Sequence, residues 1–279
     1  PPATGEARAN ALAVIAQFYA GAGRPEQAAE RFLEAARLDP ADSDMAIVLS
    51  ELARDLELHD TAVAILTQAI EHSPGSDQLH YFLGYAYDEA GRVEEAERAF
   101  RRALEINPDN YLALNHLGYM FTEHGIQLEE ALTLTQRAVE LSDEDVSPRF
   151  NNAFIVDSLG WAHHQLGNHA EAARWLREAI RRAERGNVQD GLFHEHLGDA
   201  LLADGKTGEA IAAWEEAIQV YRAAGDLESA ETAAEKILRE QPANPRIAAL
   251  LDLVREEIAS PEALALPAAD DDPEVLDLQ

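Results

Sequence analysis

The feature that most constrains this chain is a sequence period of 34 residues. Segments of similar pattern start at Ala9, Ser43, Asp77 and Tyr111, each 34 residues after the previous one. The clearest unit, 77–110, consists of two amphipathic stretches joined by a short turn. One such pair of helices cannot bury its own apolar face, so each pair must stack on the next. The period therefore predicts an α-helical solenoid.

Small residues recur at fixed places in each unit. Gly84 in the first helix and Ala96 in the second let two helix backbones approach closely. Gly91 can end the first helix because glycine tolerates a positive φ angle, and Pro108 can end the second. The equivalent small residues are Ala16, Ser50, Gly84, Gly118, Gly160 and Gly198 in the first helices, and Ala28, Ala62, Ala96, Ala131, Ala172 and Ala210 in the second.

With these residues in register, the chain resembles the tetratricopeptide repeat (TPR) family over most of its length. The resemblance implies an all-α fold, a right-handed TPR superhelix (an α-solenoid) of about six helix-turn-helix repeats with C-terminal capping helices. It also implies a protein that binds other proteins and has no catalytic activity.

Three strings, LNHLGYMF, DSLGWAHHQLG and HEHLGDALL, further resemble bacterial TPR proteins of the cell envelope, which are often lipoproteins. That resemblance implies a periplasmic or outer-membrane-associated protein, with a cytoplasmic module as the alternative. The chain opens with Pro1 rather than Met, so we expect that a signal peptide or lipid anchor could precede it.

The repeat pattern divides the chain into segments. Repeats one to four are expected within 9–142, after a flexible leader at 1–8. The fifth repeat starts at Ala153, which is 42 residues after Tyr111, so 143–152 is expected to be an inserted linker. A further insertion around GNVQDG precedes the sixth repeat. The remaining segments are expected to be repeats five and six at 153–224, a degenerate repeat with a capping helix at 225–258, and a disordered acidic tail at 259–279.

The composition restricts the class of partner. With 22 Lys and Arg against 52 Asp and Glu, the formal net charge is −30 at pH 7. Such a surface repels nucleic acids and anionic membranes, so we expect a basic or neutral protein or peptide as the partner. The chain has no cysteine, which excludes disulfides and thiolate metal sites. It also has no apolar run long enough to span a bilayer.

The first helix of each repeat is expected to line the concave surface of the solenoid. Aromatic residues occupy the same register in three successive first helices, at Tyr85, Tyr119 and Trp161. Flat rings with interleaved amides and carboxylates suit an extended peptide, because they offer apolar contact and partners for its backbone. On the same helix face lie residues one turn earlier and one turn later. The predicted peptide-binding groove is therefore Tyr81, Tyr85, Asp88, Asn115, Tyr119, Thr122, Asp157, Trp161 and His164.

Alternatives to this interpretation stay open at the level of sequence. The rings could be ordinary packing, because TPR helices bury many aromatic residues. Some TPR domains hold a carboxylate with Lys and Arg, but Arg54 is the only strong cation at matching positions. The first helices instead carry acids, which predict a basic or neutral ligand or form a solvated acidic face. These acids are Glu51, Asp55, Asp88, Glu89, Glu123, Asp157, Glu195 and Asp199.

No motif for catalysis, a metal or a cofactor emerges. His194 and His196 are about 200° apart on a helix and cannot hold one ion together. No nucleophile elbow, phosphate loop or nucleotide fingerprint is present. The expected function is a scaffold or adaptor that binds a partner segment in its concave groove. The alternatives are a truncated regulatory or assembly region of a larger protein and a self-associating structural solenoid.

Overall fold

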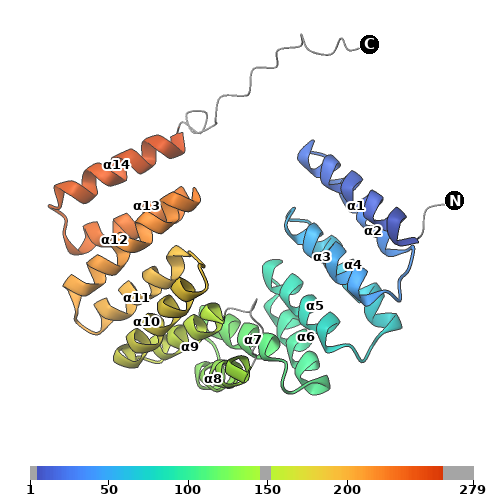
Figure 1. Cartoon of the computed structure of the whole chain (residues 1–279), viewed down its shortest axis with the longest axis horizontal. Coiled ribbons are helices and arrows are strands. Elements are labelled where there is room, and N and C mark those ends of the chain that lie inside the picture. Colours follow the sequence, from blue (N-terminus) through green and yellow to red (C-terminus); the bar gives the residue numbers. More distant parts are fainter. Residues whose placement is uncertain (1–4, 145–151, 260–279) are drawn as a thin grey trace, which may run out of the picture. The chain divides into compact units, whose positions relative to one another are not determined.

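The computed structural model describes residues 5–144 and 152–259. Within these ranges the chain forms fourteen helices and no strands (Figure 1), so the predicted all-α solenoid of helical hairpins is confirmed. In chain order the helices are α1 Gly5–Gly21, α2 Pro25–Ala36, α3 Ser43–Arg54, α4 His59–His72, α5 Asp77–Glu89, α6 Val93–Ile106, α7 Tyr111–Glu123, α8 Leu128–Glu144, α9 Ala153–Gln165, α10 His169–Arg185, α11 Gly191–Ala203, α12 Thr207–Ala224, α13 Leu227–Glu240 and α14 Pro245–Ala259.

The expected leader is helical from Gly5 onward, because GEARANALA is rich in strong helix formers. α9 begins at Ala153, and α13 and α14 occupy the expected degenerate repeat and cap. Residues 1–4, 145–151 and 260–279, which include most of the expected linker and tail, lie outside the described residues.

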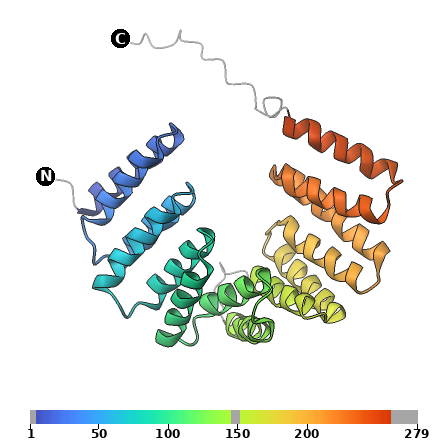
Figure 2. The ribbon, with the colours of Figure 1, turned by 180° about the vertical axis from the view of Figure 1, so that it is seen from behind.

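Two compact units make up the chain. Unit 1 is Pro1–Leu166 and contains α1 to α9, and unit 2 is Gly167–Gln279 and contains α10 to α14. In unit 1, first helices of successive pairs touch one another: α3 contacts α5, α5 contacts α7, and α7 contacts α9. Figure 2 shows the same succession of helices from behind. Equivalent residues of these first helices are therefore neighbours in space.

The small residues are required by the packing of the helix pairs. A Cβ atom on Gly84 would lie 2.6 Å from the Phe100 ring, and one on Gly198 would lie 2.4 Å from the Trp214 ring. Both rings are fully buried and have little room to move. The equivalent alanines of the second helices have no exposed surface: Ala28, Ala62, Ala96, Ala131, Ala172 and Ala210.

Tight turns join the two helices of each pair. Gly91, after α5, has a φ angle of +70°. Glu57 takes the equivalent place after α3 and has a φ angle of +59°, in the left-handed region where a side chain is disfavoured. The second pair of unit 1 therefore contains a strained turn that a glycine would relax.

Candidate protein-interaction surface

Three contacting first helices of unit 1, α5, α7 and α9, carry the predicted groove residues. Because the helices share one register, each residue of α5 has equivalents beside it on α7 and then α9. We call this surface the first-helix face of unit 1. It consists of Tyr81, Tyr85, Asp88, Leu112, Asn115, Tyr119, Thr122, Phe154, Asp157, Trp161 and His164.

Four of the nine predicted groove residues are buried. Tyr81 is 6% exposed, and its ring packs edge-on against His116 of α7 at a centroid distance of 5.4 Å. Thr122 turns back on its own helix, where its hydroxyl donates to the Tyr119 carbonyl oxygen at 2.6 Å. Asn115 and Asp157 are 6% and 3% exposed. The prediction that these side chains line an accessible groove is therefore wrong for these four, because stacking of the first helices encloses their positions.

The other five predicted residues keep accessible surface. Tyr85, Asp88, Tyr119, Trp161 and His164 are all partly exposed. The three rings that share one register are thus neither fully exposed nor sealed in the core. The structure brings these five together along one face of α5, α7 and α9.

Neighbouring helices hold the Tyr85 ring in place. The Arg54 guanidinium of α3 lies 4.0 Å from the centroid of the ring, and His116 meets it edge-on at 4.7 Å. Arg54 also pairs with Glu89, with 3.1 Å between Nη2 and Oε1. Burial raises the pKa of Tyr85, and Glu89 adds to that shift. Burial lowers the pKa of His116 to about 4, so this imidazole is neutral near pH 7.

Two contacts fix Trp161 on α9, at the opposite edge of the first-helix face from Tyr85 on α5. Its indole N–H donates to Oε1 of Glu123 on α7 at 2.6 Å, and its ring stacks on His164 at 4.7 Å with 9° between the planes. Burial raises the pKa of Asp88; His124 opposes this shift, and Glu123 adds to it. The rings therefore have carboxylates close beside them.

Sequence reasoning missed two members of this face. Leu112 on α7 and Phe154 on α9 are 36% and 46% exposed. They lie seven residues before Tyr119 and Trp161, a spacing that puts them on the same helix face. Extending the i, i+7 pattern back by one step would have found both. They enlarge the apolar part of the face.

In unit 2, the first-helix acids Glu195 and Asp199 are paired within the fold, whereas the sequence predicts that they face a basic or neutral ligand or solvent. Nζ of Lys236 on α13 lies 2.7 Å from Oε1 of Glu195 and 2.7 Å from Oδ2 of Asp199. The Tyr221 hydroxyl donates to Glu195 at 2.8 Å, and the Trp214 indole donates to Asp199 at 3.0 Å. Burial lowers the pKa of Lys236, but its hydrogen bonds to the two acids outweigh burial and the net shift is upward. Both acids already have their cation.

Across residues 5–144 and 152–259, no group of three or more His, Asp or Glu side chains is placed to hold a metal ion. None of the described helices combines the length and the apolar character required to cross a bilayer.

Sequence profiles of the tetratricopeptide repeat family match residues 14–77, 53–117 and 156–190. The chain is a tetratricopeptide repeat protein. TPR repeat-containing protein PA4667 of Pseudomonas aeruginosa is 29% identical over 180 residues, which are 64% of this TPR chain and 28% of that protein. Protein KINESIN LIGHT CHAIN-RELATED 3 of Arabidopsis thaliana is 22% identical over 200 residues, covering 68% of the chain and 30% of that protein. The chain thus spans less than a third of the length of these relatives.

Solved TPR structures share the fold. The Cut9 and Hcn1 hetero-tetramer of the APC/C superposes with a TM-score of 0.61 at 18% identity, covering 88% of this chain and 42% of that one. PilW, a type IV pilus biogenesis factor, superposes with a TM-score of 0.57 at 20% identity, covering 80% and 97%. The TPR fold supports a role as a protein–protein interaction scaffold, and TPR proteins are typically non-catalytic.

Proposed function

We propose that this TPR chain is a non-catalytic scaffold or adaptor that holds an extended segment of a partner protein on the first-helix face of unit 1. The observation that carries the proposal is the register of Tyr85, Tyr119 and Trp161. These rings keep accessible surface at equivalent positions of three contacting helices. Leu112 and Phe154 extend the apolar surface along the same helices. Rigid rings with accessible faces are typical anchors in protein interfaces.

The charges around these rings favour a basic or neutral segment. Asp88 and Glu123 lie beside the rings, and the nearby cation Arg54 is already paired with Glu89. The formal charge of −30 adds long-range attraction for a basic partner and repulsion for nucleic acid. Binding should therefore weaken as salt is raised.

Removing two rings tests the proposal. The full chain and its Tyr119→Ala, Trp161→Ala variant are used as bait, and captured proteins are identified by mass spectrometry. A peptide from the captured segment is then titrated against both by fluorescence anisotropy. We expect at least a tenfold loss of affinity, with little change in helicity or Tm.

The matched control is Trp175→Ala, which removes a half-buried tryptophan of α10 in unit 2. That variant should bind the peptide as the parent does. Equal losses in both variants, or a large drop in Tm with the double variant, would show that the rings stabilise the fold instead.

Self-association is a second candidate, favoured by the outer face of α1. Val14 and Phe18 are 64% and 72% exposed, whereas Ala86 and Met120, at the positions equivalent to Phe18, are 0% and 1% exposed. Light scattering across a concentration series tests it. A rise in mass that Phe18→Ser abolishes would support self-association through α1.

A further inference from the structure

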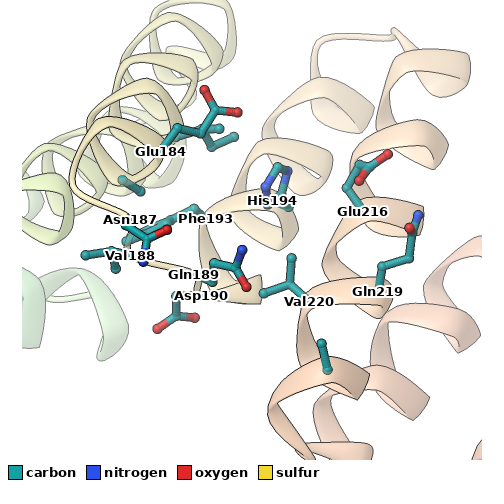
Figure 3. Close-up of a pocket in the computed structure, with 13 residues that line it drawn as sticks. Glu184, Asn187, Val188, Gln189, Asp190, Phe193, His194, Glu216, Gln219 and Val220 are labelled. Atoms are coloured by element: carbon teal, nitrogen blue, oxygen red, sulfur yellow. The ribbon is translucent and has the colours of Figure 1, made fainter.

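Unit 2 contains a cavity that shares no residue with the face described above. It holds about 440 Å³ and lies among the last turns of α10, the connection to α11, and the second half of α12 (Figure 3). Its apolar lining includes Ile180, Ala183 and Phe193, of which Ala183 and Phe193 are almost fully buried. This lining has no counterpart among the predicted groove residues.

Carboxylates and amides surround the apolar part of this cavity. Glu184 from α10 and Glu216 from α12 stand on either side of His194 of α11 (Figure 3). Asn187 and Gln219 add amide groups to the lining. None of the described residues that line the cavity is Lys or Arg. The electrostatic character of the cavity is therefore acidic.

Among residues 5–144 and 152–259, no arginine pairs with either glutamate of the cavity, whereas neighbouring glutamates on the same helices do have such partners. Glu178, nearly two turns before Glu184, accepts from Arg182 at 2.9 Å, and Glu215 lies 3.5 Å from Arg246. Within the described part of the chain, the Glu184 and Glu216 side chains have no ion pair. Burial lowers the pKa of His194 while both glutamates oppose that shift, so a neutral imidazole separates the two carboxylates near pH 7.

The connection between α10 and α11 forms one side of the first cavity, and contacts within the fold hold it in place. It contains the insertion around GNVQDG, which the regular repeats lack. Asn187 has a φ angle of +53°, and the backbone N–H of Val188 donates to the Ala183 carbonyl oxygen at 2.9 Å. This arrangement ends α10 with a residue in the left-handed region and holds the connection against the helix. α10 and α12 are also long, at 17 and 18 residues, and supply the other walls.

A second cavity of about 460 Å³ adjoins the first. The two share Ile180, Glu184, His194 and Glu216, and the second continues along α11 past Leu201. If a partner side chain occupies the first cavity, the second cavity can therefore hold residues that adjoin it in the partner's sequence.

We propose that the first cavity binds the side chain of an arginine presented by a partner protein. Its guanidinium would lie between the carboxylates of Glu184 and Glu216, and its aliphatic stem would lie against the partly exposed apolar side chains of Ile180, Val188 and Val220. A planar guanidinium with five N–H donors suits two carboxylates and an amide oxygen better than a compact ammonium does. The apolar lining suits the stem, because arginine buries its methylenes while its head keeps polar partners.

The probe for this proposal is N-acetyl-arginine methylamide, titrated into the full ¹⁵N-labelled chain. We expect saturable shifts of the backbone amides from Asn187 to Asp190 and of the His194 ring. N-acetyl-citrulline methylamide has nearly the same shape without the charge and should produce none. Equal shifts with N-acetyl-lysine methylamide would overturn the assignment of a guanidinium.

The deciding variant is Glu184→Gln with Glu216→Gln, which should weaken binding at least tenfold. The matched control, Glu228→Gln with Glu240→Gln, removes the same charge from exposed positions of α13 and should bind as the parent does. Equal weakening by both pairs, or shifts spread over the whole acidic surface, would overturn the site. Circular dichroism verifies the fold of each variant. The Tyr119→Ala, Trp161→Ala chain should bind the probe normally, so this result is independent of the proposed function.

Discussion

The two units use the same helix face in different ways. In unit 1, the register of Tyr85, Tyr119 and Trp161 carries rings that keep accessible surface. In unit 2, the equivalent residue is Asp199, which Lys236 and Trp214 engage within the fold. One repeat position thus serves as a contact surface in one unit and as a cross-link between helices in the other. The repeat therefore specifies where a side chain lies, and its chemistry decides what it does there.

The largest expected effect is in unit 2. Lys236→Ala leaves Glu195 and Asp199 without their cation in a half-buried site, which should cost about 2–3 kcal/mol of unfolding free energy. Urea unfolding followed by circular dichroism measures the loss. Lys206→Ala is the control, since that lysine forms an exposed pair with Asp204 and should change stability by under about 0.5 kcal/mol.

A rescue variant sharpens this test. Lys236→Met with Glu195→Gln and Asp199→Asn removes all three charges and should regain much of the lost stability. If Lys236→Ala proves as mild as Lys206→Ala, the contrast between the two units is wrong.

In unit 1, the cation that contacts the first-helix face is Arg54. Arg54→Ala removes both the stacking on Tyr85 and the pair with Glu89, and we expect a loss of about 2 kcal/mol. Arg54→Lys should recover less than half of it, because lysine lacks the planar fork and stacks less well. Thermal unfolding of the three chains makes the comparison. Full recovery with lysine would mean that charge alone matters at this position.

Acid should destabilise unit 1 through His116. Its pKa is lowered from 6.5 to about 4 in the folded chain. Between these values the unfolded chain binds a proton that the folded chain excludes, so stability falls as the pH falls. From pH 7 to pH 5 this group should account for about 1–2 kcal/mol. Urea unfolding of His116→Phe at both pH values should show that much less acid destabilisation, whereas the exposed His72→Phe control should match the parent.

The smallest expected effect compares a turn of unit 1 with a turn of unit 2. Glu57 and Gly205 follow first helices, with φ angles of +59° and +77°. Glu57→Gly removes the steric cost of a side chain in that region and should raise stability by about 0.5–1 kcal/mol. Gly205→Ala should lower stability by a similar amount. Differential scanning calorimetry of both variants measures the difference, and a lower Tm for Glu57→Gly would contradict it.

Much of the architecture follows from the chain's own residues. The 34-residue period and the small residues at Gly84 and Ala96 predict stacked hairpins, because small side chains at those positions allow two helix backbones to approach closely. The shared register of Tyr85, Tyr119 and Trp161 also follows from the 34-residue period and the small residues. The sequence pattern does not reveal which residues of the first-helix face stay accessible. Tyr81 and Asn115 share the helix face in sequence yet are enclosed by neighbouring helices.

By itself, the sequence determined the repeat, the pairing of helices and the excess of acid, since each depends on residue type and spacing along the chain. Only the tertiary structure decided which acids have a cation beside them. Lys236 lies 41 positions from Glu195 in sequence but 2.7 Å away in space. Contacts between different helix pairs set burial and charge pairing. The repeat period indicates which helices lie side by side, but it does not specify which of their side chains meet or how deeply they are enclosed.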